Sequence, residues 1–137
     1  MRHDAELVAE TRGWFARAAH DLRAGEIDLG AGPPLTTDVV YHAQQAAEKA
    51  MKGFLTWHSQ PFRKTHNLTE IGGLCTTIDA SLDPLLRRAA TLTAYAWKYR
   101  YPGEPEEPPL EEAEAALALA REVYDAILAR LPKEVGS

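Results

Sequence analysis

Apolar residues recur at steps of three and four along almost the whole chain, and Pro- and Gly-rich breaks divide them into five stretches. That spacing places the apolar residues on one face of an α-helix. Alternating runs typical of strands are missing, whereas Ala and Leu, which favour helices, are abundant. The stretches predict helices at about residues 4–28, 37–58, 67–78, 83–100 and 110–131. Four long helices and one short helix predict an all-α fold, an antiparallel up-and-down helical bundle.

Residues near the expected helix ends predict where the helices begin and stop. Thr36, Thr37 or Asp38 can cap the second helix, because each side chain can accept a hydrogen bond from free backbone N–H groups. Asp83 followed by Pro84 predicts a cap and a first helical residue for the fourth helix. Residues 132–137 follow the last apolar repeat, so we expect them to form a tail.

The length and charge of the chain limit its organisation and its ligands. The 137 residues suit a single domain, 1–137, with a core at about residues 4–131. The 20 acidic residues outnumber the 15 Lys and Arg, which gives a formal net charge of −5. Proteins that wrap nucleic acid over their whole surface normally carry an excess of basic residues. This balance therefore counts against whole-surface binding but leaves room for a local basic patch.

Several classes of site and location find no support in the sequence. A single cysteine, Cys75, cannot form an internal disulfide or a Cys-rich zinc site, and the five His are scattered. No Gly-rich phosphate loop occurs, so we expect no metal and no cofactor. Residues 1–6 lack an apolar stretch of signal-peptide length, and no run approaches the roughly 20 apolar residues that span a bilayer. We expect a cytoplasmic protein without membrane contact.

The second expected helix carries polar residues opposite its Ala-rich face. These residues are His42, Gln45, Lys49 and Lys52. One interpretation is a solvated face on which Glu48 and Lys52 pair at i,i+4, an interaction worth a few tenths of a kcal/mol. The other interpretation is a polar stripe that meets a ligand or a partner helix.

Two cations precede the third expected helix. Arg63 and Lys64 lie just before its start, where free backbone N–H groups could help them to hold a phosphate. The alternative is structural, since Thr65, His66 or Asn67 could simply cap the helix.

Aromatic residues alternate with cations in residues 95–102, which read Tyr-Ala-Trp-Lys-Tyr-Arg-Tyr-Pro. Aromatic rings and the Arg plane can stack on nucleobases while the cations meet phosphate. Alternatively, Tyr95 and Tyr99 pack in the core, and the cations complement the negative end of the helix. Arg100 is harder to explain in that way, because it lies where the helix gives way to a loop.

These stretches together resemble the HEPN domain family over roughly residues 9–131. Residues 14–22, with their Ala-His-Asp-Leu step, look like the opening helix of that family. Residues 41–55, followed by Lys-Thr-His-Asn-Leu at 64–68, look like its most specific segment, and Arg-Tyr-Pro at 100–102 looks like a further family element.

The resemblance implies an up-and-down helical bundle that commonly forms homodimers and acts on or around nucleotides or RNA. Members often work with a small nucleotidyltransferase encoded beside them, in toxin–antitoxin systems or as substrate-binding modules. Other members are metal-independent ribonucleases. Those enzymes use an Arg, four to six intervening residues and a His, and the paired motifs of a dimer form the cleft.

The sequence departs from that ribonuclease pattern. No His follows Arg100, only two residues separate Arg63 from His66, and seven separate Arg12 from His20. Acid–base cleavage of RNA needs a group that titrates near neutrality, and His is the usual one. Arg100 could steady the charge of a phosphate, but it could not shuttle a proton.

The sequence therefore favours a non-catalytic, homodimeric module that binds a nucleotide or RNA and works with a nucleotidyltransferase partner. Arg100 and Lys98 would meet phosphate, while Lys49, Lys52 and His66 would line a second basic edge. Whether these residues share one groove stays open at this point. Two alternatives are a ribonuclease with a rearranged site that uses His66 or His42, and a bundle that only binds another protein.

Overall fold

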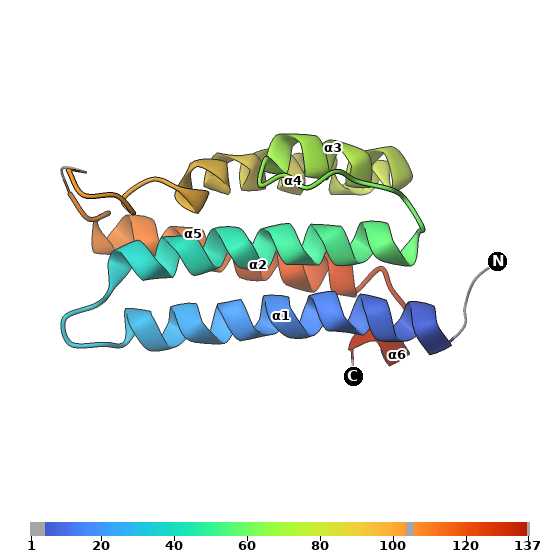
Figure 1. Cartoon of the computed structure of the whole chain (residues 1–137), viewed down its shortest axis with the longest axis horizontal. Coiled ribbons are helices and arrows are strands. Elements are labelled where there is room, and N and C mark those ends of the chain that lie inside the picture. Colours follow the sequence, from blue (N-terminus) through green and yellow to red (C-terminus); the bar gives the residue numbers. More distant parts are fainter. Residues whose placement is uncertain (1–4, 104–105, 137) are drawn as a thin grey trace.

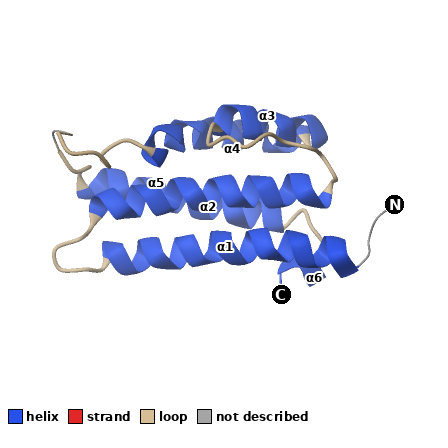
Figure 2. Cartoon of the chain, in the orientation of Figure 1, coloured by secondary structure: helices blue, strands red, loops and turns tan. Residues whose placement is uncertain are grey.

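A computed structural model of the chain describes residues 5–103 and 106–136, and its helices confirm the all-α fold. Within these ranges no residue belongs to a strand (Figure 2). The expected start of the first helix at residue 4 and part of the acidic loop, residues 104–105, lie outside the described residues. None of the described helices combines the length and the apolar character needed to cross a membrane.

Three long helices form the body of the bundle: α1 (Ala5–Leu29), α2 (Thr36–Trp57) and α5 (Leu110–Leu128). α2 runs antiparallel beside α1 and also packs on α5, so it is the central helix (Figure 1). The apolar face expected on this helix is confirmed, because Ala43, Ala47, Ala50, Phe54 and Trp57 are all buried. The small alanine side chains allow neighbouring helices to approach closely.

A second layer covers α2 on the side opposite α1 (Figure 1). It contains α3 (Leu68–Ile78), the 3-10 turn η1 (Ala80–Leu82), α4 (Asp83–Ala89) and the 3-10 helix η2 (Ala90–Ala96). Asn67 caps α3, since its Oδ1 accepts hydrogen bonds from the backbone N–H groups of Thr69 and Glu70. One of the three capping candidates before this helix is thereby identified.

The fourth expected helix is α-helical only as far as Ala89 and continues as the tighter 3-10 helix η2. Two threonines of η2 make hydrogen bonds to backbone groups. The hydroxyl of Thr91 donates to the carbonyl oxygen of Arg88 at 2.7 Å, and Thr93 Oγ1 accepts from the backbone N–H of Leu68 at 3.1 Å. Such bonds between Thr hydroxyls and backbone groups compete with the regular α-helical pattern.

Two predicted helix caps are wrong. No side chain caps α2, and the backbone N–H of Leu35, the residue before the helix, donates to the carbonyl oxygen of Asp28. Asp83 already lies inside α4, since Leu82 before it has helical dihedral angles. Its carboxylate instead accepts from Nε of Arg87 at 2.8 Å.

The end of the chain also differs from the expectation of a tail. Residues Lys133–Gly136 form a short helix, α6, that packs against α1. Val135 is buried there and belongs to the hydrophobic core. A single apolar residue with Pro132 before it is too short a pattern to predict a helix, so only the packing on α1 explains why this turn forms.

Candidate functional site

The polar stripe on α2 lies against neighbouring elements and not in open solvent. Gln45 and Lys52 are buried, while His42 and Lys49 keep about a quarter of their side-chain surface exposed, 25% and 22%. The interpretation as a solvated face is therefore wrong. The Glu48–Lys52 pair does form, with a distance of 3.0 Å from Nζ to Oε2, but it is a buried pair.

The first half of the stripe centres on a buried carboxylate from α1. Oδ1 of Asp21 lies 2.8 Å from Nδ1 of His42, and Oδ2 accepts from Nζ of Lys49 at 2.6 Å. We call these three residues the Asp21 cluster. Burial by itself would raise the pKa of Asp21, but the hydrogen bonds and charges of His42 and Lys49 outweigh it and lower that pKa. The bond to Asp21 raises the pKa of His42.

The second half of the stripe centres on Glu48, which is also buried. Its Oε1 accepts from Nε2 of Gln44 at 3.0 Å and lies 2.8 Å from Nδ1 of His66, and its Oε2 accepts from Lys52. Gln45 in turn donates to Oε1 of Gln44. We call these five residues the Glu48 cluster. Burial alone would raise the pKa of Glu48, but the bonds from Gln44, His66 and Lys52 lower it.

Lys52 is held from two further sides by aromatic rings. Its ammonium lies 5.9 Å from the ring centre of Trp14 and 5.8 Å from that of Phe62. These two rings also meet edge to face at a centroid distance of 6.1 Å. Cation–π contacts of this kind strengthen when the cation is desolvated. Lys52 is therefore fixed in place by Glu48 and by two rings.

His66 has a fixed orientation although its side chain is 65% exposed. Nδ1 lies against Glu48, and the backbone oxygen of His66 accepts from Gln44 at 3.3 Å. The next residue, Asn67, caps α3 and so restrains the backbone. Nε2 is the ring nitrogen that no other described residue bonds. A buried carboxylate behind one nitrogen and an open second nitrogen is the arrangement found in acid–base pairs.

Arg100 and Lys98 both lie over aromatic rings. The guanidinium carbon of Arg100 is 3.8 Å from the ring centre of Tyr41 on α2, and Nζ of Lys98 is 4.9 Å from that of Tyr99. Tyr99 has a φ of +69°, in the left-handed region that non-glycine residues rarely adopt. It stacks on Tyr95, whose hydroxyl donates to Glu112 of α5. Burial and this bond raise the pKa of Tyr95.

Two large aromatic side chains of the same segment face solvent. Trp97 is 54% exposed and Tyr101 is 64% exposed, whereas Tyr95 and Tyr99 are half-buried. The core-packing interpretation thus fits Tyr95 and Tyr99, but it does not fit Trp97 or Tyr101. In residues 97–101 the two exposed rings flank two cations, and this combination suits stacking on bases and contact with phosphate.

Some of the residues singled out in the sequence lie together and others do not. Arg100 stacks on Tyr41, the Tyr41 ring lies 5.7 Å from that of His42, and His42 bonds Asp21, which also holds Lys49. Arg100 and Lys49 therefore belong to one continuous series of contacts. Lys52 and His66 belong to the Glu48 cluster further along α2, and Lys98 contacts Tyr99.

Asp21 at the centre of the first cluster was not predicted from the sequence, and neither was the contact of Glu48 with His66 in the second. Asp21 lies directly before Leu22, on the buried side of α1. The sequence signal that could have identified Asp21 was therefore an acidic residue on the apolar face of a helix. Trp14 and Phe62, which flank Lys52, had no comparable signal, because their contact joins α1 to the loop after α2.

Other kinds of site find no support in the described residues. Burial raises the pKa of the Cys75 thiol to about 12, so this cysteine is not a thiolate nucleophile. Residues 5–103 and 106–136 hold no group of three or more His, Cys, Asp or Glu side chains placed to bind a metal ion.

Comparison with protein families gives one clear result. The model of a family described as HEPN domain matches residues 11–131, which is most of the chain. No curated protein and no solved structure matches the sequence.

Proposed function

The chain belongs to the HEPN domain family, and from that premise we propose that it is a non-catalytic module that binds a nucleotide or RNA. The observation that carries the proposal is the exposed segment of residues 97–101, in which Trp97 and Tyr101 flank Lys98 and Arg100. Exposed aromatic faces stack on bases of any sequence, and adjacent cations neutralise the phosphates.

Each basic residue has a distinct role in this proposal. Arg100 and Lys98 contact phosphate directly, because both are exposed and neither is paired with a carboxylate within the described part of the chain. His66 offers its open ring nitrogen to a second part of the ligand. Lys49 and Lys52 line that edge, but Asp21 and Glu48 already balance their charges. We therefore assign the two lysines a smaller share of the binding energy.

We further propose that the module acts as a homodimer and works with a nucleotidyltransferase. Large exposed apolar side chains support an interface at one end of the bundle. Ile27 lies near the end of α1, while Leu35 and Leu110 lie at the starts of α2 and α5, and Figure 1 places these three helix ends together. Exposed apolar groups that gather in this way mark interaction sites. Light scattering and co-purification with a neighbouring nucleotidyltransferase test the two associations.

Calorimetric titration with ATP and with a short single-stranded RNA, at low and at moderate salt, tests the binding. We expect binding that weakens with salt and falls about tenfold in Arg100→Ala, since one charge-assisted contact is worth roughly 1.5–3 kcal/mol. Arg88→Ala is the matched control, because Arg88 is an exposed residue of α4 paired with Glu122. Equal affinity of the Arg100→Ala protein would contradict the assignment. A flat titration with both ligands would favour a bundle that binds only another protein.

A second candidate function is metal-independent RNA cleavage, which the geometry of His66 and Glu48 favours. Glu48 fixes Nδ1 of His66 and leaves Nε2 open, so the imidazole can accept a proton from a ribose hydroxyl. This function predicts RNA cleavage in the presence of EDTA that is lost in His66→Ala and kept in His58→Ala. Intact RNA after incubation with the wild-type protein would rule it out for the RNAs tested.

A further inference from the structure

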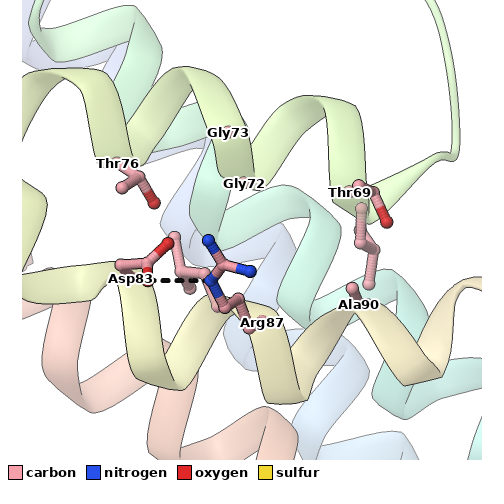
Figure 3. Close-up of a pocket in the computed structure, with 9 residues that line it drawn as sticks. Thr69, Gly72, Gly73, Thr76, Asp83, Arg87 and Ala90 are labelled. Carbon is pink, nitrogen blue, oxygen red and sulfur yellow. Dashed lines mark hydrogen bonds and ion pairs between the residues drawn. The ribbon is translucent and has the colours of Figure 1, made fainter.

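A groove of about 420 Å³ lies between α3 and α4 (Figure 3). Its apolar lining comes from Leu68, Gly72, Leu86 and Ala90, of which Leu68 and Leu86 are almost fully buried. Its polar lining residues are Thr69, Thr76, Asp83 and Arg87. An apolar floor with a few polar groups at the rim, in a hollow of this volume, is typical of sites for small ligands.

The two glycines in the middle of α3 differ in how much space surrounds them. A Cβ built at Gly72 would lie 3.4 Å from Cβ of Leu86, so a side chain there would pack in ordinary contact with α4. A Cβ at Gly73 would meet no atom within 4 Å, so packing within the chain does not require a glycine there. A glycine inside a helix costs about 1 kcal/mol relative to alanine. The bare backbone at Gly73 gives the groove a flat floor, and this is what the missing side chain provides.

Arg87 supplies an oriented cation at the centre of the groove. Its Nε donates to Oδ2 of Asp83 at 2.8 Å, which leaves the two terminal nitrogens without a partner among the described residues. Figure 3 shows the guanidinium between the two helices, on the side of Gly72 and Gly73. The hydroxyls of Thr69 and Thr76, toward opposite ends of the groove, also bond no other group within residues 5–103 and 106–136.

We propose that this groove binds a small planar aromatic compound that carries one phosphate or carboxylate group. The ring lies on the exposed backbone at Gly73, where no Cβ holds it away. The anionic group receives two parallel N–H donors from Arg87, an edge geometry that suits both phosphate and carboxylate. Thr69 or Thr76 donates a further hydrogen bond. This site does not depend on Arg100 or on the function proposed for residues 97–101.

Amide NMR titration of the whole chain tests the site with AMP and benzoate, each paired with its neutral counterpart, adenosine or benzamide. We expect AMP or benzoate at millimolar concentration to shift the amides of Thr69, Gly73 and Thr76, and the neutral compounds to bind about tenfold more weakly. Shifts with AMP alone identify a phosphate ligand, and shifts with benzoate alone identify a carboxylate ligand.

Two variants and two controls locate the site. Gly73→Leu fills the groove and Arg87→Ala removes the cation, so each should weaken binding about tenfold. Gly13→Leu is the control for the first, because Gly13 is another helical glycine with no atom within 4 Å of a built Cβ, and Arg88→Ala is the control for the second. Binding unaffected by both groove variants would overturn the proposal. Shifts confined to residues 97–101 would also overturn it while supporting the function proposed above.

Discussion

The Asp21 and Glu48 clusters contain the same three chemical groups but play different roles in the molecule. Each has a buried carboxylate, a histidine whose Nδ1 lies 2.8 Å from a carboxylate oxygen, and a lysine. In the Asp21 cluster the carboxylate comes from α1 and both cationic partners from α2, so the bonds join two helices. In the Glu48 cluster the carboxylate and the lysine share α2, and the histidine comes from the loop before α3. The first arrangement serves helix packing, and the second presents an exposed imidazole.

The largest effect is expected from removing the carboxylate of the more buried cluster. Glu48→Ala leaves Lys52, whose side chain is only 10% exposed, without its counterion. Loss of one partner from a buried pair costs about 3–5 kcal/mol of unfolding free energy. Urea denaturation followed by circular dichroism measures it. Glu48→Gln is the control that keeps the shape, and a loss below about 1 kcal/mol in Glu48→Ala would show that Lys52 is stabilised mainly by Trp14 and Phe62.

A smaller loss is expected from the equivalent change in the other cluster. Asp21→Asn leaves His42 and Lys49, both of which water can reach, so solvation relieves part of the cost. We expect a loss of about 2 kcal/mol in the same urea measurement. A loss larger than that of Glu48→Gln, the equivalent isosteric change, would reverse the ranking of the two clusters.

His42 should make the stability of the protein depend on pH. The bond to Asp21 raises the folded-state pKa of His42 above its ordinary value of 6.5. Its stabilising effect is therefore complete below about pH 6.5 and is lost as the pH rises through the folded-state pKa. Unfolding free energies measured between neutral and mildly alkaline pH should decline in the wild type and decline less in His42→Gln. An unchanged slope in His42→Gln would contradict this assignment.

At acidic pH both clusters should lose stability together. The folded-state pKa values of Asp21 and Glu48 are lowered by their hydrogen-bond donors, from ordinary values of 3.8 and 4.5. The stability that the two carboxylates provide is present above those ordinary values and is lost as the pH falls through the folded-state values. Acid titration of Asp21→Asn and Glu48→Gln should show a shallower decline than the wild type, and an equal decline would assign acid unfolding to other carboxylates.

The smallest effect on stability is expected from His66→Ala. The imidazole is largely exposed, and Glu48 keeps its bonds from Gln44 and Lys52. We expect a loss below about 1 kcal/mol by thermal denaturation. Such a small change, together with altered ligand binding or RNA cleavage, would separate the role of His66 from that of His42. A loss as large as that of Asp21→Asn would show instead that both histidines are structural.

Local periodicity was sufficient to predict the bundle, because the apolar residues that form one face of each long helix recur every three or four positions. The positions of Ala43, Ala47 and Phe54 on α2 follow directly from that rule. The change from α4 to η2 was not predictable in this way. In η2, Thr93 accepts from the backbone N–H of Leu68, a contact across 25 residues that local periodicity does not reveal.

The candidate site was only partly predictable for the same reason. Arg100 and Lys98 stand out locally, since they alternate with aromatic residues. The pairing of Asp21 with His42 spans 21 residues and depends on how α1 packs against α2. The i,i+4 spacing does predict the pairing of Lys52 with Glu48, but the carboxylate that Lys49 meets comes from α1, and the spacing of neighbouring residues does not reveal it.

The three tryptophans give the chain a set of optical reporters in contrasting surroundings. Trp57 is buried, Trp14 lies beside the ammonium of Lys52, and Trp97 faces solvent next to Lys98. An aqueous quencher such as iodide should therefore reach Trp97 first, drawn further by the cations around it. A protein that keeps only Trp97 would report by its emission whether a stacking ligand covers residues 97–101, without any attached dye.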